Sequence, residues 1–90
     1  MHERYLEVTY HKEKLLAAYY YLPRNEGDTS ARVEKHGAGL LVDLTNDGRP
    51  IGIEIAIPSL VTADAINRVL EFYGFPPIAA TELAPLEIAA

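Results

Sequence analysis

Apolar and polar side chains alternate along residues 38–57, which read AGLLVDLTNDGRPIGIEIAI, and this period of two is typical of β-strands. The dipeptide Asp47-Gly48 interrupts the alternation, and it is typical of a two-residue type I′ turn between hairpin strands. With this turn at the tip, the aliphatic side chains face each other in three pairs: Leu44 with Ile51, Val42 with Ile53, and Leu40 with Ile55. We expect this hairpin, with one wholly aliphatic face, to form the centre of the fold.

The same alternation predicts a second hairpin over residues 5–22. Lys12 and Glu13 are polar and lie between two apolar segments, so we place the turn there. The predicted pairs are Tyr10 with Leu15, Val8 with Ala17, and Leu6 with Tyr19. The second strand, residues 15–22, is apolar on both faces, so it requires cover on both sides or a subunit contact.

A polar loop and a shorter strand connect these two hairpins. Residues 23–30 (PRNEGDTS) lack apolar periodicity and form the loop, and residues 31–36 form the strand. The following turn uses Gly37-Ala38 or Ala38-Gly39. With the first of these turns, Val33 faces Val42, Arg32 faces Asp43, and Glu34 faces Leu41. Because sequential strands are usually neighbours, residues 5–57 are predicted to form a five-stranded antiparallel β-meander.

After Pro58 the apolar period changes to that of a helix. Thr62 can cap a helix over residues 62–73, and Gly74 can end it. The chain is therefore predicted to be a single α+β domain over residues 1–90, in which one C-terminal helix packs on one face of the sheet. The tail, residues 78–90, is apolar but contains Pro85, and an extended arm, a short helix and a disordered end all stay open.

One helix is too narrow to cover a five-stranded sheet. In the predicted arrangement, four apolar residues point away from the helix and form a candidate interface: Leu16, Ala18, Tyr20 and Leu22. Either a second copy of the chain or the tail must cover them. We expect a symmetric homodimer, because a two-fold contact between identical faces is the simplest cover.

Charge and composition exclude several classes of function. Thirteen acidic and eight basic residues give a net charge of -5, which argues against nucleic-acid binding and is compatible with a small basic protein partner. The apolar runs are too short to span a membrane, and Met1 is followed by polar residues instead of a leader, so we expect a cytoplasmic protein. Cysteine is absent, and His2, His11 and His36 lack the spacing of metal ligands. We therefore expect no metal and no other cofactor.

One weak candidate polar cluster could carry chemistry. It contains Asp43 and Glu54 on one face of the central hairpin, with Arg32 and His36 nearby. Paired carboxylates can act as acid and base or bind a divalent cation. The competing interpretation is a solvated sheet face with an ion pair between Arg32 and Asp43, and we favour it because nothing in the sequence predicts a cleft. The expectation is that the protein is not an enzyme.

Residues 5–57 resemble small bacterial and archaeal domains known as the domain of unknown function 2283 family. The similarity is clearest from Val42-Asp43 through Asp47-Gly48-Arg49 to Gly52-Ile53-Glu54-Ile55, and Tyr10-His11-Lys12-Glu13 stands where the family has Tyr-Asp-Pro-Glu. The family has no established activity, and some members look like partners of small toxin-like proteins. The resemblance implies an antitoxin-like role. The acidic balance, the lack of a catalytic constellation and the doubly apolar strand over residues 15–22 predict an interaction module that binds a basic protein or itself. The alternatives are a small carboxylate-based, metal-dependent enzyme and a module that binds a small ligand in a pocket lined by its tyrosines.

Overall fold

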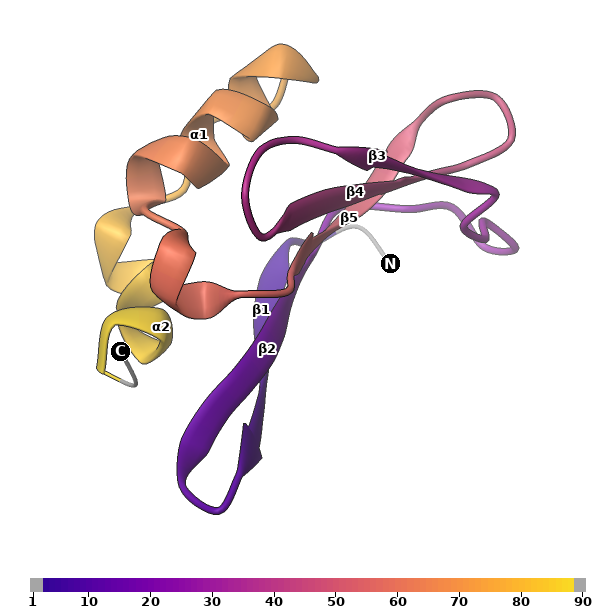
Figure 1. Ribbon diagram of the computed structural model, residues 1–90. Helices are drawn as coiled ribbons and strands as arrows, with labels where there is room; N and C mark the ends of the chain where they lie inside the picture. Colours follow the sequence, from indigo (N-terminus) through magenta and orange to yellow (C-terminus); the bar gives the residue numbers. More distant parts are fainter. Residues whose placement is uncertain (1–2, 89–90) are drawn as a thin grey trace.

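The computed structural model describes residues 3–88 and has an α+β architecture, in which one antiparallel sheet is followed by the helices (Figure 1). The strands are β1 (Tyr5–His11), β2 (Lys14–Tyr21), β3 (Arg32–Lys35), β4 (Leu40–Leu44) and β5 (Pro50–Ile55). The helices are the short η1 (Pro58–Leu60) and η2 (Ala80–Leu83), the longer α1 (Ala63–Phe72), and α2 (Ala84–Ile88). The predicted α+β class, with a five-stranded antiparallel sheet followed by a helix, is confirmed.

The strand order is β1-β2-β5-β4-β3, so the predicted meander is wrong. β2 pairs with β5, and the loop after β2 crosses to the far edge of the sheet before β3 begins. Burial explains this order. Residues Ile51, Ile53 and Ile55 of β5 are almost completely buried, whereas all of β3 is exposed. A meander would leave the aliphatic β5 at an edge, where a strand has a neighbour on one side only.

The tip of the β4–β5 hairpin lies where the sequence predicts it but has a different turn. The backbone carbonyl of Thr45 accepts a hydrogen bond from the Gly48 N–H at 2.9 Å. Within residues 45–48, only Gly48 has a positive φ, of 87°. The turn is therefore type I with a left-handed glycine after it, which adds a bulge. The bulge pairs Leu44 with Pro50 instead of Ile51, while the other two predicted pairs, Val42 with Ile53 and Leu40 with Ile55, are confirmed.

A bulge also shifts the register of the β1–β2 hairpin. The turn is the predicted one, with positive φ at Lys12 and Glu13, and Tyr10 pairs with Leu15 as expected. Beyond the bulge the predicted pairs are wrong: Val8 pairs with Ala18, and Leu6 pairs with Tyr20. Because a one-residue shift moves side chains to the other face, Ala18 and Tyr20 join the core.

The β3–β4 connection is longer than either predicted turn. His36 donates its backbone N–H to the Leu40 carbonyl at 2.9 Å, and residues 37–39 form the turn between them. The register therefore differs by one residue from the predicted one, with Arg32 opposite Leu44 and Val33 opposite Asp43. Arg32 and Asp43 thus lie on opposite faces of the sheet.

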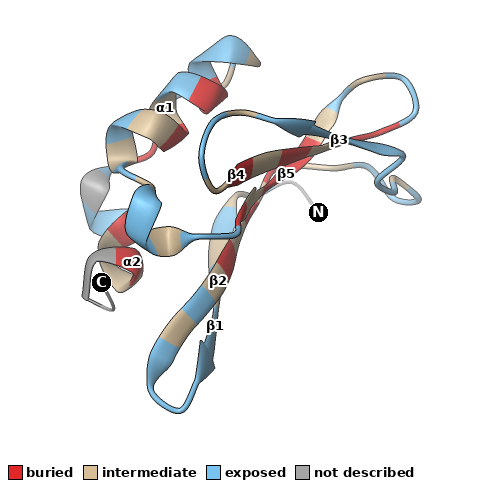
Figure 2. Cartoon of the chain, viewed as in Figure 1, coloured by how far each residue is buried: buried red, intermediate tan, exposed pale blue. Residues whose placement is uncertain are grey.

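Helix α1 and the tail helices η2 and α2 cover the same face of the sheet. The core lies between these helices and β2, β4 and β5 (Figure 2). Thr62 caps α1 by accepting a hydrogen bond from the Ala65 N–H at 3.1 Å, as predicted. Gly74 ends the helix with a φ of 81°, and Phe75 donates its N–H to the Leu70 carbonyl at 2.8 Å. This pattern is a Schellman motif, which satisfies the last carbonyls of the helix.

The tail forms short helices, which settles the alternatives left open by the sequence for residues 78–88, whereas residues 89 and 90 lie outside the described chain. Its side chains Ile78, Leu83 and Leu86 are buried in the same core as α1 and the sheet. The side chain of Asn67, on helix α1, accepts a hydrogen bond from the Ile78 N–H at 2.7 Å. The tail therefore supplies the cover that the sequence analysis assigns to a second subunit.

Candidate functional site

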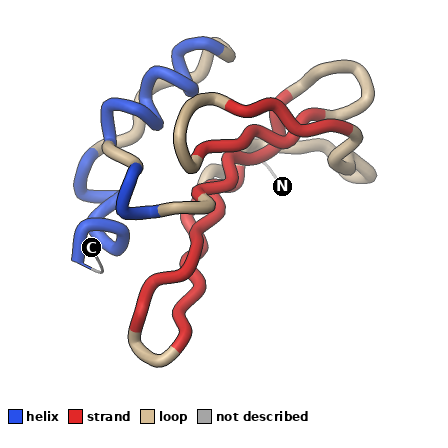
Figure 3. Tube along the Cα trace, viewed as in Figure 1, coloured by secondary structure: helices blue, strands red, loops and turns tan. Residues whose placement is uncertain are grey.

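The face of the sheet opposite the helices carries no helix in the described chain, and we call it the open face (Figure 3). Strand pairing places two rows of side chains across it. The first row is Glu7, Tyr19, Glu54, Leu41 and Lys35, and the second row is Tyr5, Tyr21, Gly52, Asp43 and Val33. The open face thus combines aromatic side chains with carboxylates.

Three tyrosines pack against one another on the open face. The Tyr5 and Tyr21 rings are stacked, with centroids 4.4 Å apart, and Tyr19 meets the Tyr21 ring edge-on at 4.7 Å. The Tyr21 hydroxyl lies 3.4 Å from a Glu7 carboxylate oxygen, to which it donates a hydrogen bond. The Arg24 guanidinium lies 5.5 Å from the centroid of the Tyr21 ring, which is cation–π geometry. These rings form an ordered surface that already contacts one cation.

Asp43 acts as a hydrogen-bond acceptor within this surface. It accepts a bond from the Tyr19 hydroxyl at 2.6 Å and another from the Ser30 hydroxyl at 3.1 Å. The Tyr19 ring crosses β5 at Gly52, where a Cβ atom would overlap the phenol ring. Burial, followed by the adjacent Asp43 carboxylate, raises the pKa of the Tyr19 phenol far above its usual value. Tyr19 therefore stays protonated and remains the donor to Asp43.

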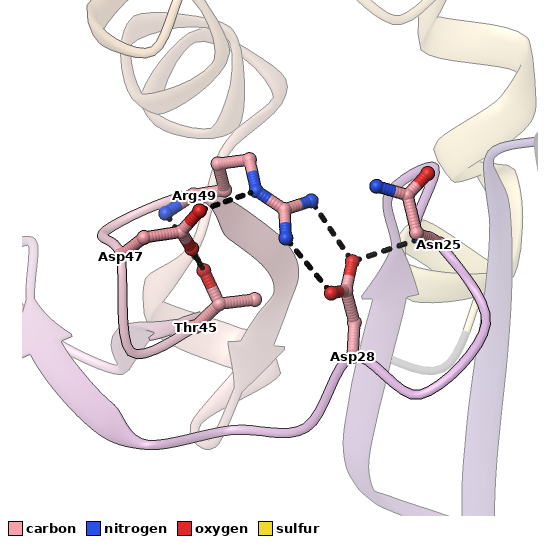
Figure 4. Close-up of polar contacts among 5 residues, drawn as sticks. All are labelled: Asn25, Asp28, Thr45, Asp47 and Arg49. Carbon is pink, nitrogen blue, oxygen red and sulfur yellow. Dashed lines mark hydrogen bonds and ion pairs between the residues drawn. The ribbon is translucent and has the colours of Figure 1, made fainter.

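A cluster of charged and polar side chains ties the crossover loop to the β4–β5 tip (Figure 4). Arg49 donates two hydrogen bonds to the two carboxylate oxygens of Asp28, at 2.8 and 2.9 Å, and one to Asp47 at 3.1 Å. Asp47 also accepts a bond from the Thr45 hydroxyl, and Asp28 accepts one from the Asn25 N–H at 2.8 Å. A bidentate pair of this kind restricts the relative orientation of the two side chains and also pairs their charges. We call these five residues the Arg49 clamp, and we assign it a structural role.

The Arg49 clamp makes stability depend on pH. Hydrogen bonds from Arg49 lower the pKa of Asp28 below its usual value. A carboxyl group with a lowered pKa in the folded state stabilises the fold fully above its unfolded pKa, and this contribution is lost as the pH falls through the folded value. We expect Asp28→Asn to destabilise the protein in urea unfolding at pH 7, and the difference from wild type to shrink below about pH 4.

The matched control for this prediction is Glu26→Gln. Glu26 is an exposed residue of the same loop, and no hydrogen bond or ion pair is recorded for it within residues 3–88. The control should follow the wild-type stability at every pH. A constant difference between wild type and Asp28→Asn from pH 7 to pH 3 would contradict the charge-based account of the clamp.

The predicted polar cluster is not brought together. Asp43 and Glu54 lie on the open face, as expected, but Arg32 and His36 lie on the face that carries the helices. His36 contacts the C-terminal end of helix α1 instead, where its Nε2 atom is hydrogen-bonded to the hydroxyl of the C-cap residue Tyr73 at 2.8 Å. No ion pair joins Arg32 to Asp43 among the described residues, nor do three potential metal ligands cluster there. The longer β3–β4 turn is the physical reason, because it shifts the register by one residue.

The predicted interface residues are divided between core and surface. Ala18, Tyr20 and Leu22 are 4%, 2% and 1% exposed and belong to the core, so the expectation that they point away from the helices is wrong. Leu16, the residue displaced by the bulge, is 53% exposed near the tip of the protruding β1–β2 hairpin. Three of the four residues are therefore unavailable for the predicted dimer contact.

Two features of the site were not predicted from the sequence. The position of Tyr19 and Tyr21 on the open face was not predicted, because an alternating pattern does not show where a bulge lies. The Arg49 clamp was missed because Asp28 and Arg49 are far apart in sequence. One signal was present: a glycine inside a strand, such as Gly52, often marks a place where another group approaches the backbone closely.

Comparison of the chain with protein-family models, with curated proteins and with solved structures found no match. The resemblance to the domain of unknown function 2283 family accordingly stays a prediction. Within residues 3–88, no helix has the length and apolar character needed to cross a membrane. The case for function therefore depends on the geometry of the surface.

Proposed function

We propose that the protein is a non-enzymatic interaction module whose open face binds a basic segment of a partner protein. The observation that carries the proposal is the ordered tyrosine surface beside Glu7 and Glu54, which no helix of the described chain covers. An antitoxin-like role, with a toxin-like protein as the basic partner, is the narrower form of this proposal and rests on the family resemblance alone.

Two properties of the open face suit arginine and lysine side chains. Tyrosine rings attract cations through the negative potential of their faces, and carboxylates at the rim add charge complementarity. Arg24 and the stacked Tyr5 ring both contact Tyr21, so a partner cation would use the Tyr5 ring, which is 45% exposed. The net charge of -5 also favours the approach of a basic partner.

The other functions considered from sequence receive less support from this geometry. Both carboxylate oxygens of Asp43 accept hydrogen bonds, and the two residues expected to assist it lie on the opposite face, which disfavours the enzymatic alternative. Self-association through the open face would bring the carboxylates Glu7 and Glu54 of two copies towards each other. A basic partner avoids that repulsion, so we favour it over a homodimer.

The proposal is tested by titrating the ¹⁵N-labelled protein with a peptide that alternates arginine and glycine. We expect amide shifts in β1, β2 and β5 and loss of binding as salt rises, because exposed charges are screened. The double variant Glu7→Gln with Glu54→Gln should bind about fivefold more weakly, since each exposed charge contributes modestly. The matched control is Asp64→Asn with Glu71→Gln, which removes the same charge from helix α1, on the other side of the sheet.

The outcomes separate a specific site from general attraction between opposite charges. Equal weakening in both double variants, or shifts spread over the whole chain, would show attraction to the net charge and contradict the proposal. A peptide that alternates glutamate and glycine should cause no shifts on the open face, and binding of that peptide would equally contradict it.

A further inference from the structure

A groove lies on the helical side of the molecule, between α1 and the β3–β4 turn. Its volume is about 340 Å³, and its walls include His36, Leu60, Arg68, Val69 and Phe72. None of these residues belongs to the open face. The groove is therefore a second surface feature, separate from the one proposed above.

Large apolar side chains stay exposed at the rim of the groove. Phe72 is 70% exposed and Leu60 is 56% exposed, and both line the groove. Exposed apolar residues are ordinary when scattered, but a group of them around one concavity indicates an interaction site.

The Phe72 ring is held in position at the rim. It meets the His36 ring edge-on with centroids 5.3 Å apart, and the neighbouring Tyr73 ring meets it edge-on at 4.9 Å. His36 is itself fixed by its hydrogen bond to the Tyr73 hydroxyl, and Tyr73 also donates to Glu34 at 3.4 Å. A fixed aromatic anchor loses little conformational entropy when a partner binds.

Arg68 supplies a positive charge to the same groove. No hydrogen bond or ion pair is recorded for its guanidinium among the described residues, although the chain has more acidic than basic side chains. Arg49, by contrast, forms ion pairs with Asp28 and Asp47. An unpaired guanidinium beside an apolar groove complements a ligand that has a carboxylate next to its apolar groups.

We propose that this groove docks an apolar segment of a partner protein that carries a carboxylate, which Arg68 binds. The volume is within the range of small-molecule sites, about 300 to 1,000 Å³, so the occupant is assigned to a protein segment on the exposure of the apolar side chains Leu60 and Phe72. A small ligand would cover only the parts of Leu60 and Phe72 that line the groove, whereas an extended segment would also cover their outer parts. The proposed chemistry is the opposite of that assigned to the open face, so the two proposals stand or fall separately.

The test uses fluorescence anisotropy with a labelled peptide that contains leucine, phenylalanine and aspartate residues, and with a second peptide in which asparagine replaces each aspartate. We expect Arg68→Gln to weaken binding of the acidic peptide about tenfold, because a charge-assisted hydrogen bond is lost. The control Arg32→Gln, which makes the same charge change outside the groove, should leave binding unchanged. Phe72→Ala should weaken both peptides, and because the ring is exposed the variant should fold normally.

Three results would overturn the proposal. The first is equal weakening by Arg68→Gln and Arg32→Gln, which would indicate general attraction to positive charge. The second is displacement of the peptide by octanoate at similar concentration, which would make the groove a small-molecule site. The third is no anisotropy change at millimolar protein. The Glu7→Gln and Glu54→Gln variant should bind the acidic peptide at least as well as wild type, which keeps this test distinct from that of the open face.

Discussion

Leu83→Ala is expected to lower the free energy of unfolding by about 3 kcal/mol, because it removes a buried leucine and leaves a cavity. Leu83 is 2% exposed and lies in the same core as helix α1 and the sheet. The loss is large for a domain of this size, whose total stability is on the order of 5 to 10 kcal/mol. Urea unfolding followed by circular dichroism measures the change.

The matched control for Leu83→Ala is Leu60→Ala, the same substitution at a residue that is 56% exposed. It should change the unfolding free energy by less than about 0.5 kcal/mol. If the two variants were equally stable, the tail would not be part of the core, and the cover of Tyr20 and Leu22 would have to come from elsewhere, a second copy of the chain included.

The features that the sequence predicted correctly depend on residues close together in the chain. Lys12 and Glu13 form the first hairpin turn, Thr62 caps α1, and Gly74 ends it, each through the backbone conformation or side-chain oxygen that the residue supplies. The pairing of Val42 with Ile53 was also predictable, because hydrophobic alternation on both sides of one short loop admits few registers.

The features that the sequence did not predict depend on contacts between distant segments. The strand order follows from the burial of β5 between β2 and β4, which no local pattern expresses. The packing of the tail follows from contacts such as those of Asn67 with Ile78 and of Arg4 with the Pro76 carbonyl, which accepts a hydrogen bond at 2.7 Å. Alternation shows that two residue sets lie on different faces, but it does not show which face the helices cover.

In the candidate site, too, the prediction was correct within one hairpin and wrong across a less certain turn. Asp43 and Glu54 were placed correctly on one face, because they lie on the two strands of the hairpin whose register was predicted in that region. Arg32 and His36 were placed wrongly, because the turn over residues 37–39 differs by one residue from either predicted turn. A single residue in a turn is enough to move a predicted side chain to the opposite surface of a sheet.

Gly52→Ala is expected to destabilise the protein by about 2 kcal/mol, through steric overlap and the loss of a hydrogen bond. A Cβ atom at this position would overlap the Tyr19 phenol, which lies across the glycine. The ring would have to move, and its 2.6 Å hydrogen bond to Asp43 would break. Because Gly52 has no positive φ, backbone strain contributes nothing to the expected loss.

Overlap with Tyr19 as the cause of this destabilisation is tested by combining Gly52→Ala with Tyr19→Ala. Urea unfolding is measured for the wild type, both single variants and the double variant. Removing the phenol ring removes the three atoms nearest to the added Cβ. Because alanine suits a strand better than glycine does, Gly52→Ala should be neutral or stabilise by up to about 0.5 kcal/mol in the Tyr19→Ala background. The coupling energy between the two positions should then be about 2 kcal/mol. Additive effects would mean that the glycine is needed for another reason, and that Tyr19 does not lie across β5 in solution.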